Sequence, residues 1–261
     1  MNDEDVARCW DENAPVWARH VRRGYDQYRD LFNNPAFFEF VGSLAGLHVL
    51  DAGCGEGYNT RLLALQGARM TGVDISAKMI ELARAEEERE PLDIRYEVAS
   101  MSDMSVFAGA TFDAVVSTMA LMDCADYEGA VREFWRVLRP EGLLAFNICH
   151  PCFTYGTPEW VRDERGEVVG VQLGDYFREG PHVVKWKFGA APDREQVEPF
   201  TYPAFHRRLE NLMSPLCASG FRIEAILEPR PSEEACRQRP SLRKHRLIPH
   251  NLCVKGRKPA R

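Results

Sequence analysis

The stretch VLDAGCGEGYNTRLLA, residues 49–64, places three glycines, at positions 53, 55 and 57, between an apolar run and a helix-like segment. Glycine carries an entropic cost, so it is kept where the backbone turns sharply or closely approaches another group. The apolar pattern predicts a short buried strand over His48–Ala52 and a helix over Tyr58–Leu65. Three glycines at one strand-to-helix turn, with Asp51 just before them, indicate a turn that contacts a ligand.

The following segments alternate between predicted strands and predicted helices. Further strands are predicted at Met70–Asp74, Ile94–Val98, Phe112–Ser117 and Leu143–Ile148. The intervening pattern predicts helices at Ala77–Glu88 and Tyr127–Leu138, the second ended by RPEG at 139–142. Strands that alternate with helices of about 10–15 residues are typical of βαβ units. We therefore expect an α/β fold in which helices cover both faces of a mostly parallel sheet.

The segments that flank this core follow other patterns. Residues 3–34 are helix-like, and we expect Pro15 to break them into two helices that form a lid over 1–46. Residues 151–205, rich in proline, glycine and aromatic residues such as Tyr155 and Trp186, contain strand-like VVGVQL and HVVKWKF and predict an inserted antiparallel β cap. A helix over 206–219 and strands over 221–227 and 252–255 return to the core, which comprises 47–150 and 206–261.

Composition favours a protein of the cytoplasm. The 261 residues carry a net charge of −6, contain no apolar run long enough to span a bilayer, and begin with an acidic, polar segment unlike a signal peptide. The eight cysteines are scattered, which indicates reduced thiols. From Arg237 to Arg261 nine Lys or Arg occur without Asp or Glu. This basic stretch is either a solvated surface or a docking site for an anionic substrate or RNA.

The residue at the end of the second predicted strand indicates which class of ligand the turn binds. Asp74 follows Asp51 by 23 residues, and ligands of parallel sheets bind beyond the carboxyl ends of the strands. An acidic residue there can accept hydrogen bonds from both ribose hydroxyls of an adenosine. A dinucleotide site requires Gly-x-Gly-x-x-Gly, whereas this turn reads Gly-x-Gly-x-Gly and places Glu56 where a pyrophosphate would approach. The pattern therefore disfavours a nicotinamide or flavin dinucleotide.

The motifs resemble one known family. DAGCGEG at 51–57 with TGVDIS at 71–76 resembles motif I and its successor in the class I S-adenosylmethionine-dependent methyltransferases. FDAVVSTMALMDCADYEGAVREFWRVLRPEGLL at 112–144 is similar to the rest of that family's core, in the small-molecule, methyltransferase type 11-like branch that includes quinone-biosynthesis enzymes. The resemblance covers residues 47–150 and implies a Rossmann-like, seven-stranded sheet that binds S-adenosyl-L-methionine and releases S-adenosyl-L-homocysteine.

The resemblance also implies roles for individual residues. The glycine turn approaches the methionine part of the cofactor, Asp74 holds the ribose, Ile75 packs on adenine, and Asp51 braces the turn. Ser100 and Met101 lie at the adenine edge, where many members of the family have Asp in place of Ser100. Tyr25 and Arg29, at i and i+4 of a predicted helix, close over the cofactor, with Arg29 on its carboxylate; a solvent-exposed helical face is the alternative. The cofactor-binding residues are thus expected to be Tyr25, Arg29, Asp51, Gly53, Cys54, Gly55, Asp74, Ile75, Ser100, Met101 and Thr118.

Methyl transfer from a sulfonium needs alignment more than it needs a fixed set of catalytic groups. Three polar residues at predicted strand or helix ends are candidates for catalysis: Asp123, His150, and His206 at the start of the helix after the cap. Each has a structural hydrogen-bonding role as its alternative. The CHPC sequence at 149–152 lacks a second cysteine pair, so we expect no metal site there.

These patterns predict an enzyme that methylates a small molecule. The Asn/Asp-Pro-Pro-Tyr motif of nucleic-acid amino methylation is replaced by STMA at 117–120, so nucleic acid is a disfavoured partner, and nothing indicates a membrane partner. Two alternatives remain. The basic stretch is consistent with a tRNA or protein methyltransferase, and a regulator that binds the cofactor without catalysis would share the same turn.

Overall fold

The glycine turn joins the first strand of a seven-stranded sheet to a helix that packs against it. The structure, a computed structural model, describes residues 1–154 and 158–260, so Tyr155 of the predicted cap lies outside the described residues. The sheet has the order β10-β11-β5-β4-β1-β2-β3, and only β11 runs antiparallel to its neighbours. Its strands are β1 His48–Ala52, β2 Arg69–Asp74, β3 Arg95–Val98, β4 Phe112–Thr118, β5 Leu138–Cys149, β10 Arg222–Leu227 and β11 Asn251–Arg257. The predicted Rossmann-like α/β fold is confirmed.

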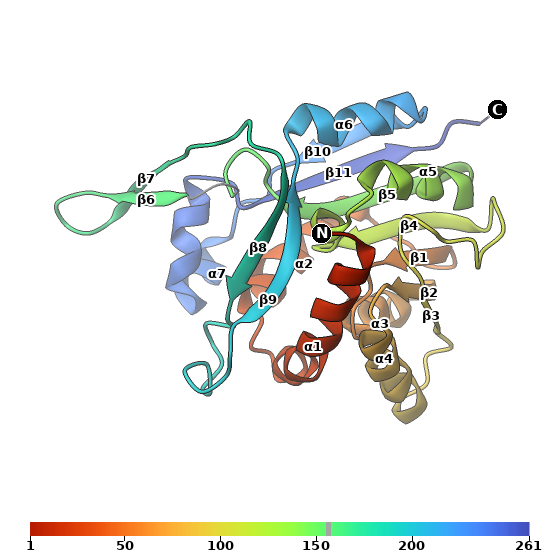
Figure 1. The fold of residues 1–261 in the computed structure, drawn as a ribbon, viewed down its shortest axis with the longest axis horizontal. Helices are drawn as coiled ribbons and strands as arrows, with labels where there is room; N and C mark the ends of the chain where they lie inside the picture. The colour runs from red at the N-terminus through yellow and green to blue at the C-terminus, as the bar shows by residue number, and fades with distance from the viewer. Residues whose placement is uncertain (155–157, 261) are drawn as a thin grey trace.

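Helices cover both faces of this sheet, because successive residues of a strand point to opposite faces. Leu50 of β1 belongs to a core with helices α5 and α6, and its neighbour Val49 belongs to a second core with α2, α3 and α4. Figure 1 shows the two helical layers on either side of the sheet. The helices are α2 Asn34–Val41, α3 Tyr58–Leu65, α4 Ala77–Arg89, α5 Tyr127–Val137 and α6 Leu209–Ala218. The helices predicted at 58–65, 77–88 and 127–138 lie within one residue of these bounds, α6 begins three residues after 206, and α2 was not predicted. The expected break at residues 139–142 was wrong, because β5 begins at Leu138 and these residues belong to the strand, which pairs through Leu138 with Phe112 of β4.

The N-terminal segment differs from the prediction. Helix α1 runs without a break over Asp3–Arg22, with Pro15 inside it. A proline in a helix interior costs about 3 kcal/mol, but contacts on the α4 side hold the helix together. The Asp11 carboxylate accepts hydrogen bonds from the Ser76 hydroxyl at 2.6 Å and the Lys78 backbone N–H at 2.9 Å. The expected break at Pro15 was therefore wrong, because tertiary contacts outweigh the local preference.

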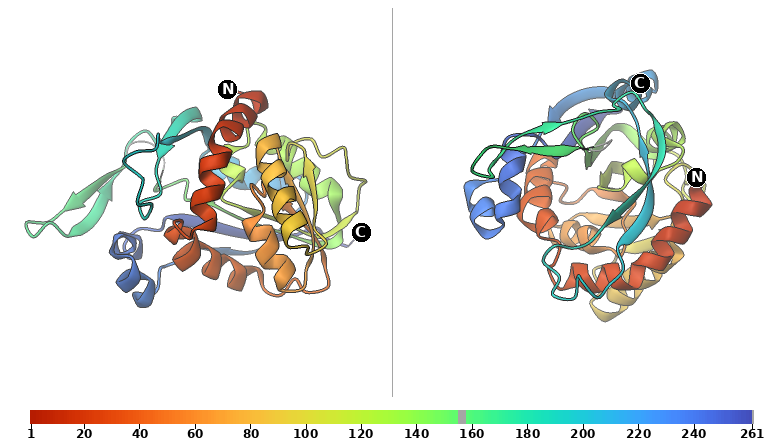
Figure 2. Two further views of the ribbon diagram at one scale, coloured as in Figure 1. Left: turned by 90° about the horizontal axis from the view of Figure 1, so that it is seen from below. Right: turned by 60° about the vertical axis from the view of Figure 1, so that its left-hand side comes forward.

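The inserted cap consists of two antiparallel hairpins. One pairs β6 Glu159–Arg162 with β7 Val168–Gln172 and projects from the rest of the molecule (Figure 2). The other pairs β8 Gly180–Trp186 with β9 Phe200–His206 and packs against α1 through an aromatic cluster. The predicted antiparallel cap is confirmed. The placement of His206 at a helix start was wrong, because this residue ends β9 and α6 begins at Leu209.

Several short elements were not predicted. A π-helical turn η1, Arg29–Asn33, precedes α2, and a 3-10 turn η2, Leu121–Asp123, follows β4. Helix α7, Glu233–Gln238, and the 3-10 helix η3, Pro240–Arg246, stand between β10 and β11. Among the described residues, none of the helices has the length and hydropathy needed to cross a membrane.

Candidate active site

A cavity of about 760 Å³ lies beyond the carboxyl ends of the core strands. Helix α1 and the β8–β9 hairpin contribute aromatic residues to its wall, among them Trp10, Trp186 and Tyr202. All eleven residues predicted to bind the cofactor line this one cavity: Tyr25, Arg29, Asp51, Gly53, Cys54, Gly55, Asp74, Ile75, Ser100, Met101 and Thr118. Asp123 lines it as well, whereas His150 and His206 are not among its lining residues.

Protein atoms fill the space beside Gly53 of the glycine turn, whereas the space beside Gly55 is open. At Gly53 the backbone is left-handed, with φ of 78°, and an added Cβ would overlap the side chain of Ala120. At Gly55, with φ of 55°, an added Cβ would meet nothing within 4 Å. Asp51 braces the turn by accepting a 2.7 Å hydrogen bond from the Thr60 hydroxyl, and burial raises the pKa of Asp51 to about 7. The turn is thus rigid at its base and exposes backbone to the cavity at Gly55.

Asp74 stands opposite this turn at the end of β2. Its Oδ2 accepts the Gly55 backbone N–H at 2.8 Å and its Oδ1 accepts the Ser76 backbone N–H at 2.9 Å. Burial raises the pKa of Asp74 to about 6, while these two backbone bonds favour the charged form. A carboxylate has about four acceptor positions, so the two oxygens retain the capacity to accept two hydroxyls from the cavity.

Arg29 supplies a buried cation to the same cavity. Its guanidinium lies 3.8 Å from the ring centre of Tyr58, and its Nε donates to Asp30 at 2.9 Å. The Nη2 atom is buried and has no hydrogen-bond partner among the residues that the structure describes. Because an unpaired buried donor is costly, this guanidinium is suited to an anionic group of a ligand.

The expected helical pairing of Tyr25 with Arg29 was wrong. Gly24, with φ of 72°, ends the first helix region, so Tyr25 lies in a loop and Arg29 begins η1. Both side chains nevertheless line the cavity. They come together through this turn in the chain and not through a shared helical face.

The first turn of α1 reaches the end of β3. The Ser100 hydroxyl donates to the Asp3 carboxylate at 2.7 Å, and the Ser102 hydroxyl donates to the same oxygen at 3.1 Å. Asp3 also lines the cavity. A carboxylate is therefore present beside Ser100, but it is supplied by the N-terminal helix.

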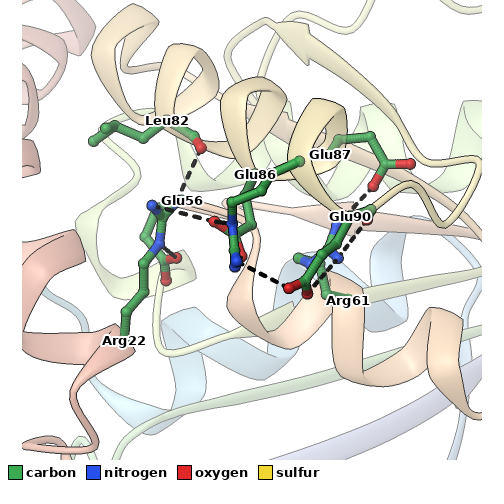
Figure 3. Close-up of polar contacts among 8 residues, drawn as sticks. Arg22, Glu56, Arg61, Leu82, Glu86, Glu87 and Glu90 are labelled. Atoms are coloured by element: carbon green, nitrogen blue, oxygen red, sulfur yellow. Dashed lines mark hydrogen bonds and ion pairs between the residues drawn. The ribbon is translucent and has the colours of Figure 1, made fainter.

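The other end of α1 is fastened to the glycine turn and to α4. Figure 3 shows Arg22 between the two elements: Nε lies 3.6 Å from Glu56 Oε2, Nη1 lies 3.5 Å from Glu86 Oε2, and Nη2 donates to the Leu82 carbonyl at 2.9 Å. Burial raises the pKa of Glu56 to about 7, although Arg22 and Arg29 favour its charged form. These contacts hold α1 across the cavity.

Asp123 is the predicted catalytic residue that lines the cavity. It lies in η2, is 5% exposed, and its Oδ1 has no partner within the described chain. Burial raises the pKa of Asp123 well above its usual value, and a hydrogen bond from Trp10 opposes this shift. A buried carboxyl with a free oxygen beside the end of β4 is able to contact an acceptor.

The two predicted histidines have partners outside the cavity. His150 Nε2 lies 2.8 Å from Glu228 Oε1, and its Nδ1 accepts the Cys152 backbone N–H at 3.1 Å. His206 Nε2 lies 2.8 Å from the Tyr176 carbonyl oxygen. These contacts match the structural alternative for both residues.

Residues near the C-terminus complete the cavity wall. None was named individually as a site residue, although a docking site for an anionic substrate or RNA was one interpretation of the basic stretch. They are Arg239, Ser241, Lys244, His245, Ile248, Pro249 and His250, from η3 and the segments on either side of it. One feature of the sequence pointed to these residues, namely the basic stretch that begins at Arg237. Nothing in its spacing indicated that part of it faces inward.

Comparison with known proteins gives three concordant results. Residues 50–146 match the family model of a methyltransferase domain. A ubiquinone biosynthesis O-methyltransferase from Methylocella silvestris is 36% identical over 162 residues, which cover 55% of this chain and 62% of that protein. The chain thus spans less than two thirds of the length of this relative.

Solved structures resemble most of the chain. An S-adenosylmethionine-dependent methyltransferase from Mesorhizobium loti superposes with a TM-score of 0.69 at 28% identity, covering 85% of this chain and 96% of that one. The 1,6-didemethyltoxoflavin-N1-methyltransferase of Burkholderia thailandensis, solved with its substrate and S-adenosylhomocysteine, shares the fold at 16% identity and a TM-score of 0.55, covering 99% of this chain and 91% of that one.

Proposed function

The chain carries a class I S-adenosylmethionine-dependent methyltransferase domain of the type 11-like branch, and from this premise we propose that it transfers a methyl group from S-adenosyl-L-methionine to a small-molecule acceptor. The proposal rests on one observation: an acidic and a basic side chain line the same cavity. Asp74 presents carboxylate oxygens beside the open turn at Gly55, and Arg29 presents a guanidinium nitrogen that has no hydrogen-bond partner within the described residues.

The chemistry of these groups fits the parts of the cofactor. Asp74 would accept hydrogen bonds from the ribose hydroxyls, and Arg29 would pair with the carboxylate of the methionine moiety. Ile75 and Met101 offer apolar contact to the adenine, while Asp3 and Ser100 offer polar groups at its edge. When bound, the cofactor supplies a methyl group on a sulfonium, which is already a good leaving group.

The protein's contribution would be alignment, exclusion of water and, for a protonated acceptor, removal of a proton. Alignment of two bound reactants lowers a barrier by up to roughly 7–11 kcal/mol. We propose residues 1–46 as a lid and 151–205 as a cap that together exclude water, because Trp10 of α1 stacks on Tyr202 of β9 at 4.7 Å between ring centres. Asp123 Oδ1 is the proposed hydrogen-bond acceptor for the reacting group.

We propose that the reaction takes place in the cytoplasm. All eight cysteines are unpaired, and Cys54, Cys124, Cys236 and Cys253 are buried as thiols. Free buried thiols are typical of reducing compartments. The proposed acceptor is a small molecule, because the relative from Methylocella is an O-methyltransferase of ubiquinone biosynthesis.

The test is a transfer assay in which the purified chain and a methyl-labelled donor are incubated separately with a metabolite extract, with tRNA and with cell protein, and the labelled products are identified. Small molecules with a hydroxyl group form the first panel and ring nitrogens the second, following the two named relatives. We expect label in one small product. Label in tRNA or protein, or cofactor binding without any labelled product, would refute the proposal in favour of the respective alternative.

A further inference from the structure

The cavity has an acidic part and a cationic part. Its acidic lining residues come from the N-terminal segment, the glycine turn, β2 and η2; they are Asp3, Asp26, Asp51, Glu56, Asp74 and Asp123. The part formed by Arg239, η3 and the segment after β8 contributes Lys187, Arg239 and Lys244 to the lining, and no acidic residue. This wall of the cavity is thus cationic.

The basic stretch divides into paired and unpaired cations. Arg237 forms an ion pair with Glu234, and Arg246 forms one with Glu233 at 2.9 Å. Arg239 and Lys244 line the cavity, and within the described part of the chain neither forms an ion pair. The Nε of Arg239 donates only to the Ser241 hydroxyl, at 3.0 Å.

Arg239 and Lys244 each contact an uncharged group. The Lys244 ammonium lies 4.7 Å from the ring centre of Trp160, and burial lowers its pKa, with Arg162 adding to the shift. An added Cβ on Gly189 would overlap Nη2 of Arg239, so this guanidinium lies directly against the backbone near Lys187. Positive charge without a nearby carboxylate is unfavourable, so an anion at this wall would be attracted strongly.

A buried histidine lies beside these cations. His245 is 4% exposed and lines the cavity. Burial, with help from His250 and Lys244, lowers the pKa of His245 to about 2, and a backbone hydrogen bond with Ile248 opposes this shift. The ring is therefore neutral and adds no positive charge to that of Arg239 and Lys244.

Resting on the proposed function, we propose that this wall of the cavity binds an anionic group of the methyl acceptor, a carboxylate or a phosphate, through Arg239 and Lys244, with the ring of His245 beside them. The anion belongs to a small molecule and not to an RNA backbone, because these groups line a cavity beside Trp160. Arg243, from the same stretch, is exposed at the surface.

The experiment titrates the full chain, saturated with S-adenosyl-L-homocysteine, with benzoate, phenyl phosphate and neutral benzamide, followed by nuclear magnetic resonance. The variants are Lys244→Gln and Arg239→Gln, and the matched control is Arg243→Gln. We expect one or both anions to bind more tightly than benzamide and to shift the ring signals of His245. Each variant should weaken anion binding on the order of tenfold, as for loss of one charge-assisted hydrogen bond. The control should leave anion binding unchanged.

Several results would overturn the inference. These are equal binding of benzamide and the anions, no binding of either anion to the wild type, or unchanged binding in both variants. An equal effect of Arg243→Gln, together with salt-sensitive binding of an RNA oligonucleotide, would indicate a nucleic-acid surface instead. If S-adenosyl-L-homocysteine does not bind but the anions still bind through Arg239 and Lys244, the proposed function fails while the anion site stands. The preference between benzoate and phenyl phosphate identifies the anion.

Discussion

Replacing Asp74 by Asn removes the negative charge that we propose to contact the ribose hydroxyls, and it keeps the shape of the side chain. The carboxylate already accepts the Gly55 and Ser76 backbone N–H groups at 2.8 and 2.9 Å, and Asp74 lines the cavity. An amide has one oxygen, so it cannot accept from two backbone donors and two hydroxyls. Loss of two hydrogen bonds to a charged group, each about 1.5–3 kcal/mol, predicts a cofactor affinity at least ~100-fold weaker.

The assay is calorimetric titration with S-adenosyl-L-homocysteine across a range of pH. Ribose hydroxyls favour the charged carboxylate, so cofactor binding lowers the pKa of Asp74 from about 6 and releases a proton. The contribution of Asp74 to the affinity should be constant above pH 6 and should fall about tenfold per pH unit below it. Asp51 and Glu56, whose pKa values are about 7, also line the cavity, so the comparison that isolates Asp74 is the difference between wild type and Asp74→Asn.

The matched control for this substitution is Asp113→Asn. Asp113 also accepts a backbone N–H, that of His48 at 2.8 Å, but it stands near the start of β4 and outside the cavity. We expect its cofactor affinity to equal that of the wild type. A folded Asp74→Asn variant that binds S-adenosyl-L-homocysteine within about threefold of the wild type would refute the placement of the ribose.

Three further substitutions test the lid and the acceptor side. Asp3→Ala should weaken cofactor binding by about 3- to 10-fold, because the substitution removes a hydrogen-bonded carboxylate from the edge of the cavity. Replacing the neighbouring exposed Glu4 by Ala should leave cofactor binding unchanged. Equal effects of the two substitutions in calorimetry would contradict the role of Asp3 at the cavity edge. Arg22→Gln should speed cofactor release and hydrogen exchange in α1, since it removes the contacts to Glu56 and α4; unchanged release in stopped-flow measurements would show that these contacts do not hold the lid. Asp123→Asn should lower the rate of label transfer by about 100-fold with cofactor affinity unchanged; lost affinity in a folded variant would count against an acceptor-facing role.

The local pattern of the sequence was sufficient to predict the core. The glycine turn, Asp74 and the alternating apolar runs predicted four strands and three helices close to their observed bounds, because these elements depend on neighbouring residues. The fifth strand was predicted to begin at Leu143, but β5 begins at Leu138 and includes residues 139–142. Pro15 shows where this reasoning fails: contacts of Asp11 with α4, distant in sequence, keep α1 continuous. The prediction that His206 begins a helix was wrong for a related reason, since strand pairing with β8 extends β9 to that residue.

The site was predictable only where its residues follow the core strands. The predicted cofactor residues that follow core strands line the cavity because the carboxyl ends of parallel strands converge at one edge. Tyr25 and Arg29 also line it, but they reach it through the loop after α1 and through η1, and not through the expected shared helix. Lys244, His245 and His250 were missed, because α7 and η3 bring them to that edge through a chain path that no periodicity encodes. The sequence of a basic stretch is the same whether its cations face solvent or a cavity, so the sequence does not distinguish the two arrangements.

The most direct measurement is calorimetry of the full chain with S-adenosyl-L-methionine and, separately, with a nicotinamide dinucleotide. Asp74, Arg29 and the turn at Gly55 should give saturable heat with the sulfonium compound at one site per chain and none with the dinucleotide, whose pyrophosphate would face Glu56. Heat from the dinucleotide alone would contradict the assignment of the cavity to an adenosyl sulfonium.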